Sequence, residues 1–140
     1  CILRPQLREM GERGERWNCI YSALEERLNR IQGIAVPERE PNEEFVASSI
    51  QFHVSGLSAE QIQGLADRCT ARGVAIKWFG RDEPMGYTSQ YHHWEYLTPQ
   101  ELPDTRHMLS TTCDMRIPLA LTASECDAIA GILSEEMAAA

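Results

Sequence analysis

The sequence predicts a small α/β domain of the α+β-like kind, in which a three-stranded sheet is flanked by helices. Three observations lead to this prediction. Short segments rich in β-branched and aromatic residues alternate with segments of helical periodicity. Two of the helical segments begin with the same capping pattern, and a long apolar stripe near the N-terminus predicts one extended helix. The length of 140 residues fits a single domain with a modest core.

The N-terminal stripe places apolar or small residues three or four positions apart on one helix face. Its members are Leu3, Leu7, Met10, Gly14, Trp17, Tyr21, Leu24, Leu28 and Ile31. Pro5 predicts a kink or the true start of this helix, and Gly33 predicts a cap after its end. The stripe indicates either a connecting helix packed lengthwise on its own domain or the seam of a coiled coil. We expect a connecting helix at residues 1–33 and the rest of the domain at residues 34–140.

The first predicted strand covers residues 45–54 and follows a polar loop at residues 37–44. Apolar residues recur along it in the way that is typical of a strand with one buried face. These residues are Val46, Ile50, Phe52 and Val54. Two further strands are expected at residues 74–79 and 114–119, so that three strands form the sheet.

Two capped helices follow the first and last of these strands. Their capping boxes, in which two side chains satisfy free backbone N–H groups, are Ser58 with Gln61 and Thr122 with Glu125. The apolar faces that follow them are Ile62, Leu65, Ala66 and Cys69 in one helix, and Cys126, Ile129, Ala130 and Leu133 in the other. A shorter helix is expected between them, at about residues 104–112.

Charge and cysteine content argue against several classes of protein. The net charge is −8 and the cations are not clustered, so a nucleic-acid partner is not expected. No segment has the length of a membrane span and no signal-peptide pattern is present, so we expect no membrane partner and a cytoplasmic location. The five cysteines lack a CxxC pair, which argues against a disulfide framework and a zinc site. The sequence begins at Cys1 inside the helical pattern, which we interpret as a fragment.

Aromatic residues concentrate in residues 77–97, which contain six of the ten in the chain. A long segment without clear periodicity but with many aromatic side chains is typical of a pocket or a partner surface. The expected substrate-binding residues in it are Trp78, Phe79, Tyr87, His92 and His93. The alternative is a loop that folds its aromatic side chains onto its own domain.

Charged residues add two candidates to this site. The guanidinium groups of Arg81 and Arg116 could each form a two-pronged pair with a substrate carboxylate, although a solvated or structural role is the common one for arginine. His92 and His93 lack a third ligand at a suitable spacing, so no metal site is expected. Lys77, the only lysine, is expected to be a charge on the exposed side of a strand, because no glycine-rich phosphate cradle accompanies it.

Several segments resemble the C-terminal part of the DegT/DnrJ/StrS-type aminotransferases, a fold-type-I pyridoxal-phosphate family. The N-terminal CILRPQL is similar to the helix that leaves the family's large domain, and FVASSIQFHV leads to ARGVAIKW, where the family commonly has an "RGI" run. The segment ELPDTRHMLSTTCDMRIPLALTASECDAIAGIL is similar to the family's closing pattern of Leu-Pro, short helix, strand with Pro-Leu, and threonine-capped last helix.

The resemblance implies an enzyme that moves an amino group from an amino acid to a keto or aldehyde acceptor, often a sugar derivative. It implies that pyridoxal phosphate and its Schiff-base lysine belong mainly to an N-terminal large domain, so no catalytic residue is assigned in this chain. It also implies a homodimer when full-length. The family's usual His-Tyr pair falls on Phe79 and Gly80, which puts an ordinary nucleotide-sugar substrate in doubt. The alternative hypothesis is a non-enzymatic module that dimerises through the stripe of residues 3–31.

Overall fold

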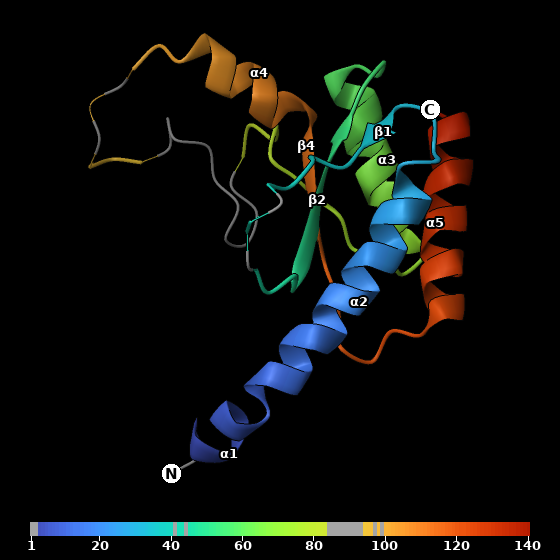
Figure 1. Ribbon diagram of the computed structural model, residues 1–140. Coiled ribbons are helices and arrows are strands. Elements are labelled where there is room, and N and C mark those ends of the chain that lie inside the picture. Colours follow the sequence, from blue (N-terminus) through green and yellow to red (C-terminus); the bar gives the residue numbers. More distant parts are fainter. Residues whose placement is uncertain (1–2, 41, 44, 84–93, 97, 99) are drawn as a thin grey trace.

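The computed structural model describes residues 3–40, 42–43, 45–83, 94–96, 98 and 100–140. Helices and a small antiparallel sheet form one layer each, and the N-terminal helices project beyond the sheet (Figure 1). The elements in chain order are α1 (Leu3–Arg8), α2 (Met10–Leu28), β1 (Ile34–Ala35), β2 (Ser49–Val54), α3 (Ala59–Ala71), β3 (Lys77–Trp78), α4 (Pro103–Thr111), β4 (Thr112–Arg116) and α5 (Ala123–Ala138).

The sheet has four strands in the order β1-β2-β4-β3, and every neighbouring pair is antiparallel. The class of fold is therefore as predicted, while the strand count is four instead of three. The additional strand is β1, whose residues Ile34 and Ala35 pair with Val54 and His53. A strand of two residues has no room for a period of two, so the sequence pattern carries no signal for it.

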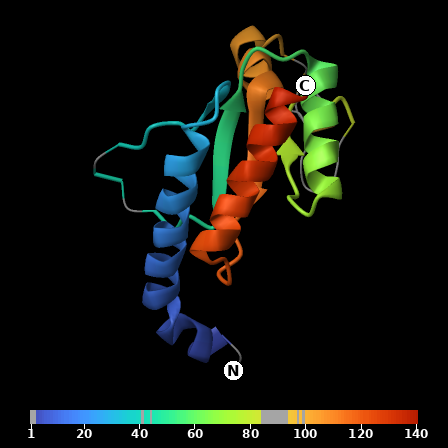
Figure 2. The same cartoon turned by 90° about the vertical axis from the view of Figure 1, so that its right-hand side faces the viewer.

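Helices α2, α3 and α5 lie side by side on one face of the sheet (Figure 2). The residues of β2 that point to these helices alternate along the strand, and Ile50, Phe52 and Val54 are completely buried. They pack in one core with Leu24 of α2 and Leu133 of α5, both also inaccessible to solvent. Burial of this one face explains why three helices are needed to cover so small a sheet.

Both predicted capping boxes are present. The Ser58 hydroxyl accepts a hydrogen bond from the Gln61 N–H, and the Gln61 side chain accepts one from the Ser58 N–H. Thr122 and Glu125 make the same pair of contacts at the start of α5. Each box satisfies backbone donors that would otherwise be free, which fixes the residue at which the helix begins.

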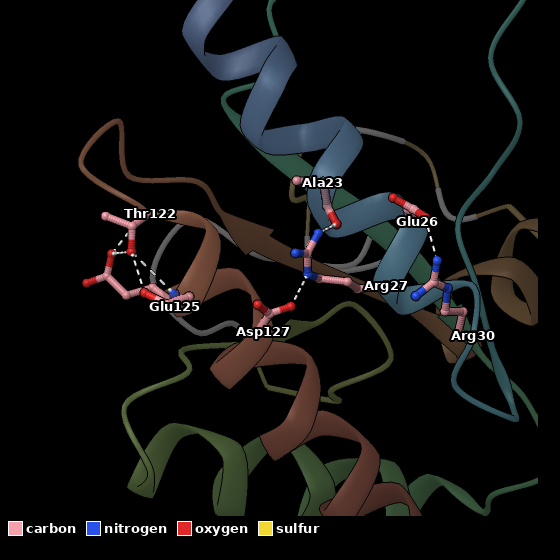
Figure 3. A network of polar contacts seen from close by, with 8 residues as sticks. Ala23, Glu26, Arg27, Arg30, Thr122, Glu125 and Asp127 are labelled. Carbon is pink, nitrogen blue, oxygen red and sulfur yellow. Dashed lines mark hydrogen bonds and ion pairs between the residues drawn. The ribbon is translucent and has the colours of Figure 1, made fainter.

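Ion pairs join α5 to both neighbouring helices. Arg27 of α2 donates from Nε to the Asp127 carboxylate at 2.6 Å and from its terminal nitrogen to the Ala23 carbonyl, as Figure 3 shows. On the other side, Arg68 of α3 lies 2.6 Å from a carboxylate oxygen of Glu136, which is largely buried for a charged residue. These contacts are partly exposed, so they orient the helices more than they stabilise the fold.

The N-terminal stripe has two different environments. The helix is interrupted at Glu9, between α1 and α2, instead of at Pro5. Tyr21, Leu24 and Leu28 are buried in the core, whereas Leu7 and Met10 are 55% and 61% exposed. Gly33 has φ of +87°, so it forms the turn into β1 that its left-handed conformation permits.

The other predicted strands are longer than the observed ones. Residues 45–48 do not join β2, and Val46 is exposed instead of buried as expected. The strands expected at residues 74–79 and 114–119 are Lys77–Trp78 and Thr112–Arg116. Apolar residues continue beyond these strands, because Val74, Ile76 and Ile117 are buried in connecting segments. Burial therefore extends beyond the residues assigned to the strands, and the Ile117 N–H still donates to the Ser48 carbonyl at 2.9 Å.

Candidate functional site

A cleft of about 580 Å³ lies between the first turn of α3 and the chain that follows β3. Its described lining residues are Ala59, Glu60, Gln63, Trp78, Gly80, Arg81, Asp82 and Glu83. The Ser58 cap sets where α3 starts, so that Ala59, Glu60 and Gln63 share the side of the helix that faces the cleft. The helix contributes polar groups, β3 contributes the Trp78 indole, and the chain after β3 contributes charged groups.

Trp78 and Gly80 fit against each other in the wall of this cleft. The Trp78 indole is buried, and its Nε1–H donates to the Ser110 carbonyl at 2.9 Å. A Cβ placed on Gly80 would lie 2.4 Å from two carbons of this ring, which is far inside van der Waals contact. The residue at position 80 is therefore restricted to glycine as long as the indole keeps its position.

Arg81 is anchored to α3. Its guanidinium donates to Asp67 at 2.9 Å, and Gln63 donates to the other oxygen of the same carboxylate at 2.7 Å. The hydrogen bond from Gln63, followed by the one from Arg81, holds the pKa of Asp67 below its ordinary value. The side chain of Arg81 is only 21% exposed, so its guanidinium is held at the edge of the cleft in a defined orientation.

The sheet face opposite α2, α3 and α5 carries a second group of polar residues. Side chains of directly paired residues share a face, and Cys113 points to the helices together with its partners Phe52 and Trp78. Asp114, the next residue of β4, points to the opposite face with its partners Gln51 and Lys77. Arg116 and Thr112 flank Asp114 on the same strand and the same face, and Ser49 and His53 of β2 are their partners.

The residues predicted to bind substrate therefore divide between two places. Trp78 and Arg81 line the cleft, and Phe79 follows directly, half-buried, with its N–H bonded to the Thr112 carbonyl at 3.0 Å. Arg116 is exposed at the far end of β4, about 13 Å along the strand from Thr112 and on the opposite face from Trp78. The structure does not bring Arg116 together with the cleft.

The remaining predicted residues, Tyr87, His92 and His93, lie outside the residues that the structure describes. Farther along the aromatic segment, Trp94 and Tyr96 stack on each other with ring centroids 6.2 Å apart. Both side chains are exposed, 40% for Trp94 and 81% for Tyr96. This part of the segment is therefore not folded into the core of its own domain.

The described residues do not form a cofactor cradle of their own. A phosphate site needs several N–H groups converging at a helix N-terminus or in a glycine-rich turn. The glycines with positive φ are Gly33, Gly56 and Gly73, which belong to separate turns. Lys77 lies across the strand pair from Asp114 and outside the cleft lining, so it does not meet a phosphate cradle. Within residues 3–40, 42–43, 45–83, 94–96, 98 and 100–140, no cluster of His, Cys, Asp and Glu suits a metal ion.

Sequence reasoning missed Glu60 and Gln63 in the cleft and Asp114 on the sheet face. The capping box at Ser58 fixes where α3 begins and therefore that Glu60 and Gln63 lie on one side of the helix, but no local pattern places that side beside the chain after β3. Asp114 was included in the predicted strand, but its partners Gln51 and Lys77 depend on register, which the sequence does not specify.

No protein-family model and no curated protein matches this sequence. Solved structures do match its fold. The chain superimposes on 3-amino-5-hydroxybenzoic acid synthase with a TM-score of 0.76 at 21% identity, over 99% of this chain and 38% of that one. It superimposes on the aminotransferase TlmJ from Streptoalloteichus hindustanus with a TM-score of 0.77 at 20% identity, over 97% and 35%. For a DegT DnrJ EryC1 StrS aminotransferase from Brucella abortus the TM-score is 0.69 at 18% identity, over 95% and 33%.

These matches define the class of fold. The chain has the fold of a part of the DegT/DnrJ/EryC1/StrS-type aminotransferases, over almost its whole length. It spans about a third of the length of the solved structures that it matches. The described part of the chain contains no helix long and apolar enough to cross a membrane.

Proposed function

We propose that the chain is the substrate-side, C-terminal part of a pyridoxal-phosphate-dependent aminotransferase. The reaction would move an amino group from an amino acid to a keto or aldehyde acceptor, which includes sugar derivatives. The observation that carries the proposal is the fold match to an aminotransferase over 97% of the chain with a TM-score of 0.77. The part that binds the cofactor and carries the catalytic lysine would lie outside residues 1–140, and the whole enzyme would be a homodimer.

Within this proposal, the cleft beside α3 would form part of the wall on the acceptor side. Trp78, Phe79 and Arg81 would shape it, together with Tyr87, His92 and His93 from the same segment. The ion pair of Arg81 with Asp67 supports a shaping role, because the guanidinium is held in one orientation. Arg116 would bind a substrate carboxylate, since its side chain is exposed and no described residue forms an ion pair with it.

The cofactor assignment can be tested on the isolated chain and on the enzyme. The isolated chain should form no saturable aldimine with pyridoxal phosphate and should not transaminate, with Lys77→Arg as the matched control. The polypeptide or complex that contains residues 1–140, purified under native conditions, should contain the cofactor and transfer an amino group. A saturable, Lys77-dependent aldimine on the isolated chain would contradict the assignment, and so would a purified enzyme without the cofactor.

Arg116 provides a separate test in the active enzyme. Arg116→Gln should raise KM for the carboxylate-bearing substrate by about tenfold, because a bidentate ion pair is lost. Arg106→Gln is the control, since Arg106 is also exposed but lies on α4. If the two substitutions raise KM equally, Arg116 does not bind the substrate carboxylate.

A second candidate function is a module that dimerises through its N-terminal stripe. The exposure of Leu7 and Met10 favours this possibility, because apolar side chains on a projecting helix are a suitable surface for association. The burial of Leu24 and Leu28 in the core restricts that surface to the first part of the stripe.

A further inference from the structure

Asp67 of α3 joins two side chains that line the cleft. One of its carboxylate oxygens accepts a hydrogen bond from the Arg81 guanidinium at 2.9 Å, and the other accepts one from the Gln63 amide at 2.7 Å. Gln63 lies one turn before Asp67 on the same helix, so the two side chains are neighbours on its surface. Each oxygen therefore has its own donor, and the carboxylate cannot turn without losing one of the two contacts.

The location of Asp67 separates the holding of Arg81 from the binding of a substrate. The Asp67 side chain is 61% exposed and lies outside the described lining of the cleft, whereas that of Arg81 is 21% exposed and belongs to this lining. A change at Asp67 can therefore affect a molecule in the cleft only through the residues that it holds. An ion pair with so exposed a carboxylate contributes little to stability, so its main effect is to orient the guanidinium.

Arg81 depends on this contact for its orientation. It follows the two-residue strand β3 where the chain has no regular structure, and the residue before it, Gly80, has no side chain to pack against it. An arginine side chain has many rotamers, but its five N–H groups lie in one plane. The N–H that Asp67 holds therefore constrains the direction of the whole group at the edge of the cleft.

The charges near Arg81 indicate which chemical group it can meet in the cleft. Arg81 is the only lysine or arginine in the described lining, and Asp67 places the opposite charge beside it. The sequence that continues from it, residues 82–105, contains neither lysine nor arginine. The other charged side chains of the described lining are the carboxylates of Glu60, Asp82 and Glu83. These charges repel a phosphate, whereas a neutral oxygen can accept a hydrogen bond from the guanidinium without this cost.

We propose that Asp67, together with Gln63, is a positioning residue that directs Arg81 toward a hydroxyl or carbonyl oxygen of the amino acceptor and thereby sets the affinity for that acceptor. The inference rests on the proposed function and deepens it. It gives a role to a residue of α3 that lies outside the cleft, and it requires the part of the acceptor beside Arg81 to carry no phosphate. Asp67 itself does not touch the acceptor, and its effect passes through the guanidinium of Arg81.

The test uses the native enzyme that contains residues 1–140, loaded with pyridoxamine phosphate, the aminated form of the cofactor. Dihydroxyacetone is the uncharged acceptor probe, and the absorbance of pyridoxal phosphate measures the second-order rate constant of amino transfer. Asp67→Ala should lower this constant about fivefold and leave the unfolding midpoint unchanged, because the lost ion pair is exposed and alanine suits a helix. Glu26→Gln is the matched control, since it breaks an exposed ion pair with Arg30 on α2, and it should change neither quantity.

A double-mutant cycle shows whether Asp67 acts through Arg81. Arg81→Gln should lower the rate constant at least as much as Asp67→Ala does, and Asp67→Ala should have no further effect in the Arg81→Gln background. Additive effects of the two substitutions would overturn the proposal, and so would an unchanged rate constant for Asp67→Ala alone. A lower affinity of Asp67→Ala for pyridoxamine phosphate would also overturn it, because a general disturbance of the enzyme would then explain the slower transfer.

Dihydroxyacetone phosphate tests which kind of group lies beside Arg81. It has the same carbonyl group with a phosphate attached, so it should react about tenfold more slowly than dihydroxyacetone, because the charges of the cleft repel it. An equal or faster reaction would overturn the assignment of a neutral oxygen.

These outcomes can be told apart from a failure of the proposed function. A native enzyme that neither binds pyridoxamine phosphate nor transfers its amino group would refute the function. An enzyme that transfers the amino group equally fast as wild type and as Asp67→Ala would refute the positioning role alone. Transfer to pyruvate but not to dihydroxyacetone would keep the function and overturn the neutral acceptor group.

Discussion

Gly80 lies so close to the Trp78 indole that no larger side chain fits at position 80. The indole is fixed from two sides, by burial and by the hydrogen bond from its Nε1–H to Ser110. The ring cannot move away from a new Cβ without breaking that bond and leaving the core. The shape of the cleft wall therefore depends on both residues together. A substitution of one of them should change the position of the other.

We expect Gly80→Ala to reduce the free energy of unfolding by about 1–3 kcal/mol, because the new methyl group would overlap the Trp78 ring. Urea unfolding monitored by circular dichroism measures this change. Gly11→Ala is the matched control. Gly11 lies inside α2 with no atom within 4 Å of its added Cβ, so alanine there should stabilise the chain by about 0.5–1 kcal/mol. Equal shifts for both variants would contradict the packing of Gly80 against Trp78.

Two buried cysteines should make the stability of the chain depend on pH in the alkaline range. Burial raises the pKa of Cys69 to about 11 and that of Cys113 to about 12. Unfolded thiols ionise near about 8.5, so above that pH the unfolded state loses protons that the folded state keeps. The free energy of unfolding should therefore fall as pH rises from about 9 toward the folded pKa values.

The double variant Cys69→Ala/Cys113→Ala should show a weaker fall in unfolding midpoint between about pH 8 and pH 10 than the wild type. Its overall stability will be lower because two buried side chains are truncated, so the slopes with pH are compared and not the absolute values. Cys19→Ser, at an exposed position on α2, serves as the control and should keep the wild-type slope. Identical slopes in the wild type and the double variant would show that these thiols do not contribute to the pH dependence of stability.

At the scale of single elements, the start of α5 depends on the contact between Thr122 and Glu125. The hydrogen bonds that Thr122 donates to the Glu125 carboxylate hold the pKa of Glu125 below its ordinary value. The charged carboxylate also lies in the first turn, where the helix dipole favours it. Figure 3 shows this contact at the helix end that packs near α2.

Because the folded pKa of Glu125 is lowered, its contribution to stability is present above the unfolded pKa of about 4.3 and is lost as pH falls through the folded value. Glu125→Gln can keep the capping box, since its side-chain oxygen can accept the same hydrogen bonds, but it does not titrate. Between about pH 5 and pH 3 the variant should therefore lose less stability than the wild type. Thermal unfolding across this pH range measures the difference. Parallel curves of unfolding temperature against pH for the wild type and Glu125→Gln would contradict the prediction.

The helices with capping boxes are the elements that could be predicted most closely from sequence. Ser58 and Thr122 mark their starts by local chemistry, and the apolar residues after them, such as Leu65 and Leu133, are buried as expected. Strand limits could not be predicted in the same way. Ile117 is as buried as a strand residue and donates its N–H to the Ser48 carbonyl, yet it lies beyond β4, because the end of a strand depends on its pairing with a distant strand and burial does not.

The candidate site was partly accessible from the sequence. Trp78 and Arg81 could be selected because aromatic and guanidinium groups concentrate there, and the structure places both in the cleft. The separation of Arg116 from them could not be anticipated, because it depends on the register of β3 against β4. Gln63 of α3 also lines the cleft, although no local sequence pattern connects this helix with the chain after β3.

At the scale of the whole molecule, the N-terminal helices belong to two different regions. The second half of α2 is part of the core and packs against α5. The start of α2 and α1 project away from the domain, as Figures 1 and 2 show. Leu7, Met10 and the nearby Val46 are all more than half exposed there. We propose that this apolar surface on a projecting helix associates with another protein surface, either the rest of an aminotransferase or a second copy.

Charged substitutions in the two halves of the stripe should distinguish folding from association. Leu24→Asp should unfold the isolated chain, because it places a charge at a completely buried position. Leu7→Asp should leave the circular dichroism spectrum and the unfolding midpoint unchanged, because Leu7 is 55% exposed. Sedimentation of the wild type and of the two variants then measures the oligomeric state of each. If the wild type is a dimer and Leu7→Asp is a folded monomer, the stripe is a dimer interface, which supports the module. If the wild type and Leu7→Asp are both monomers, the module is contradicted, because its stripe does not hold two copies together.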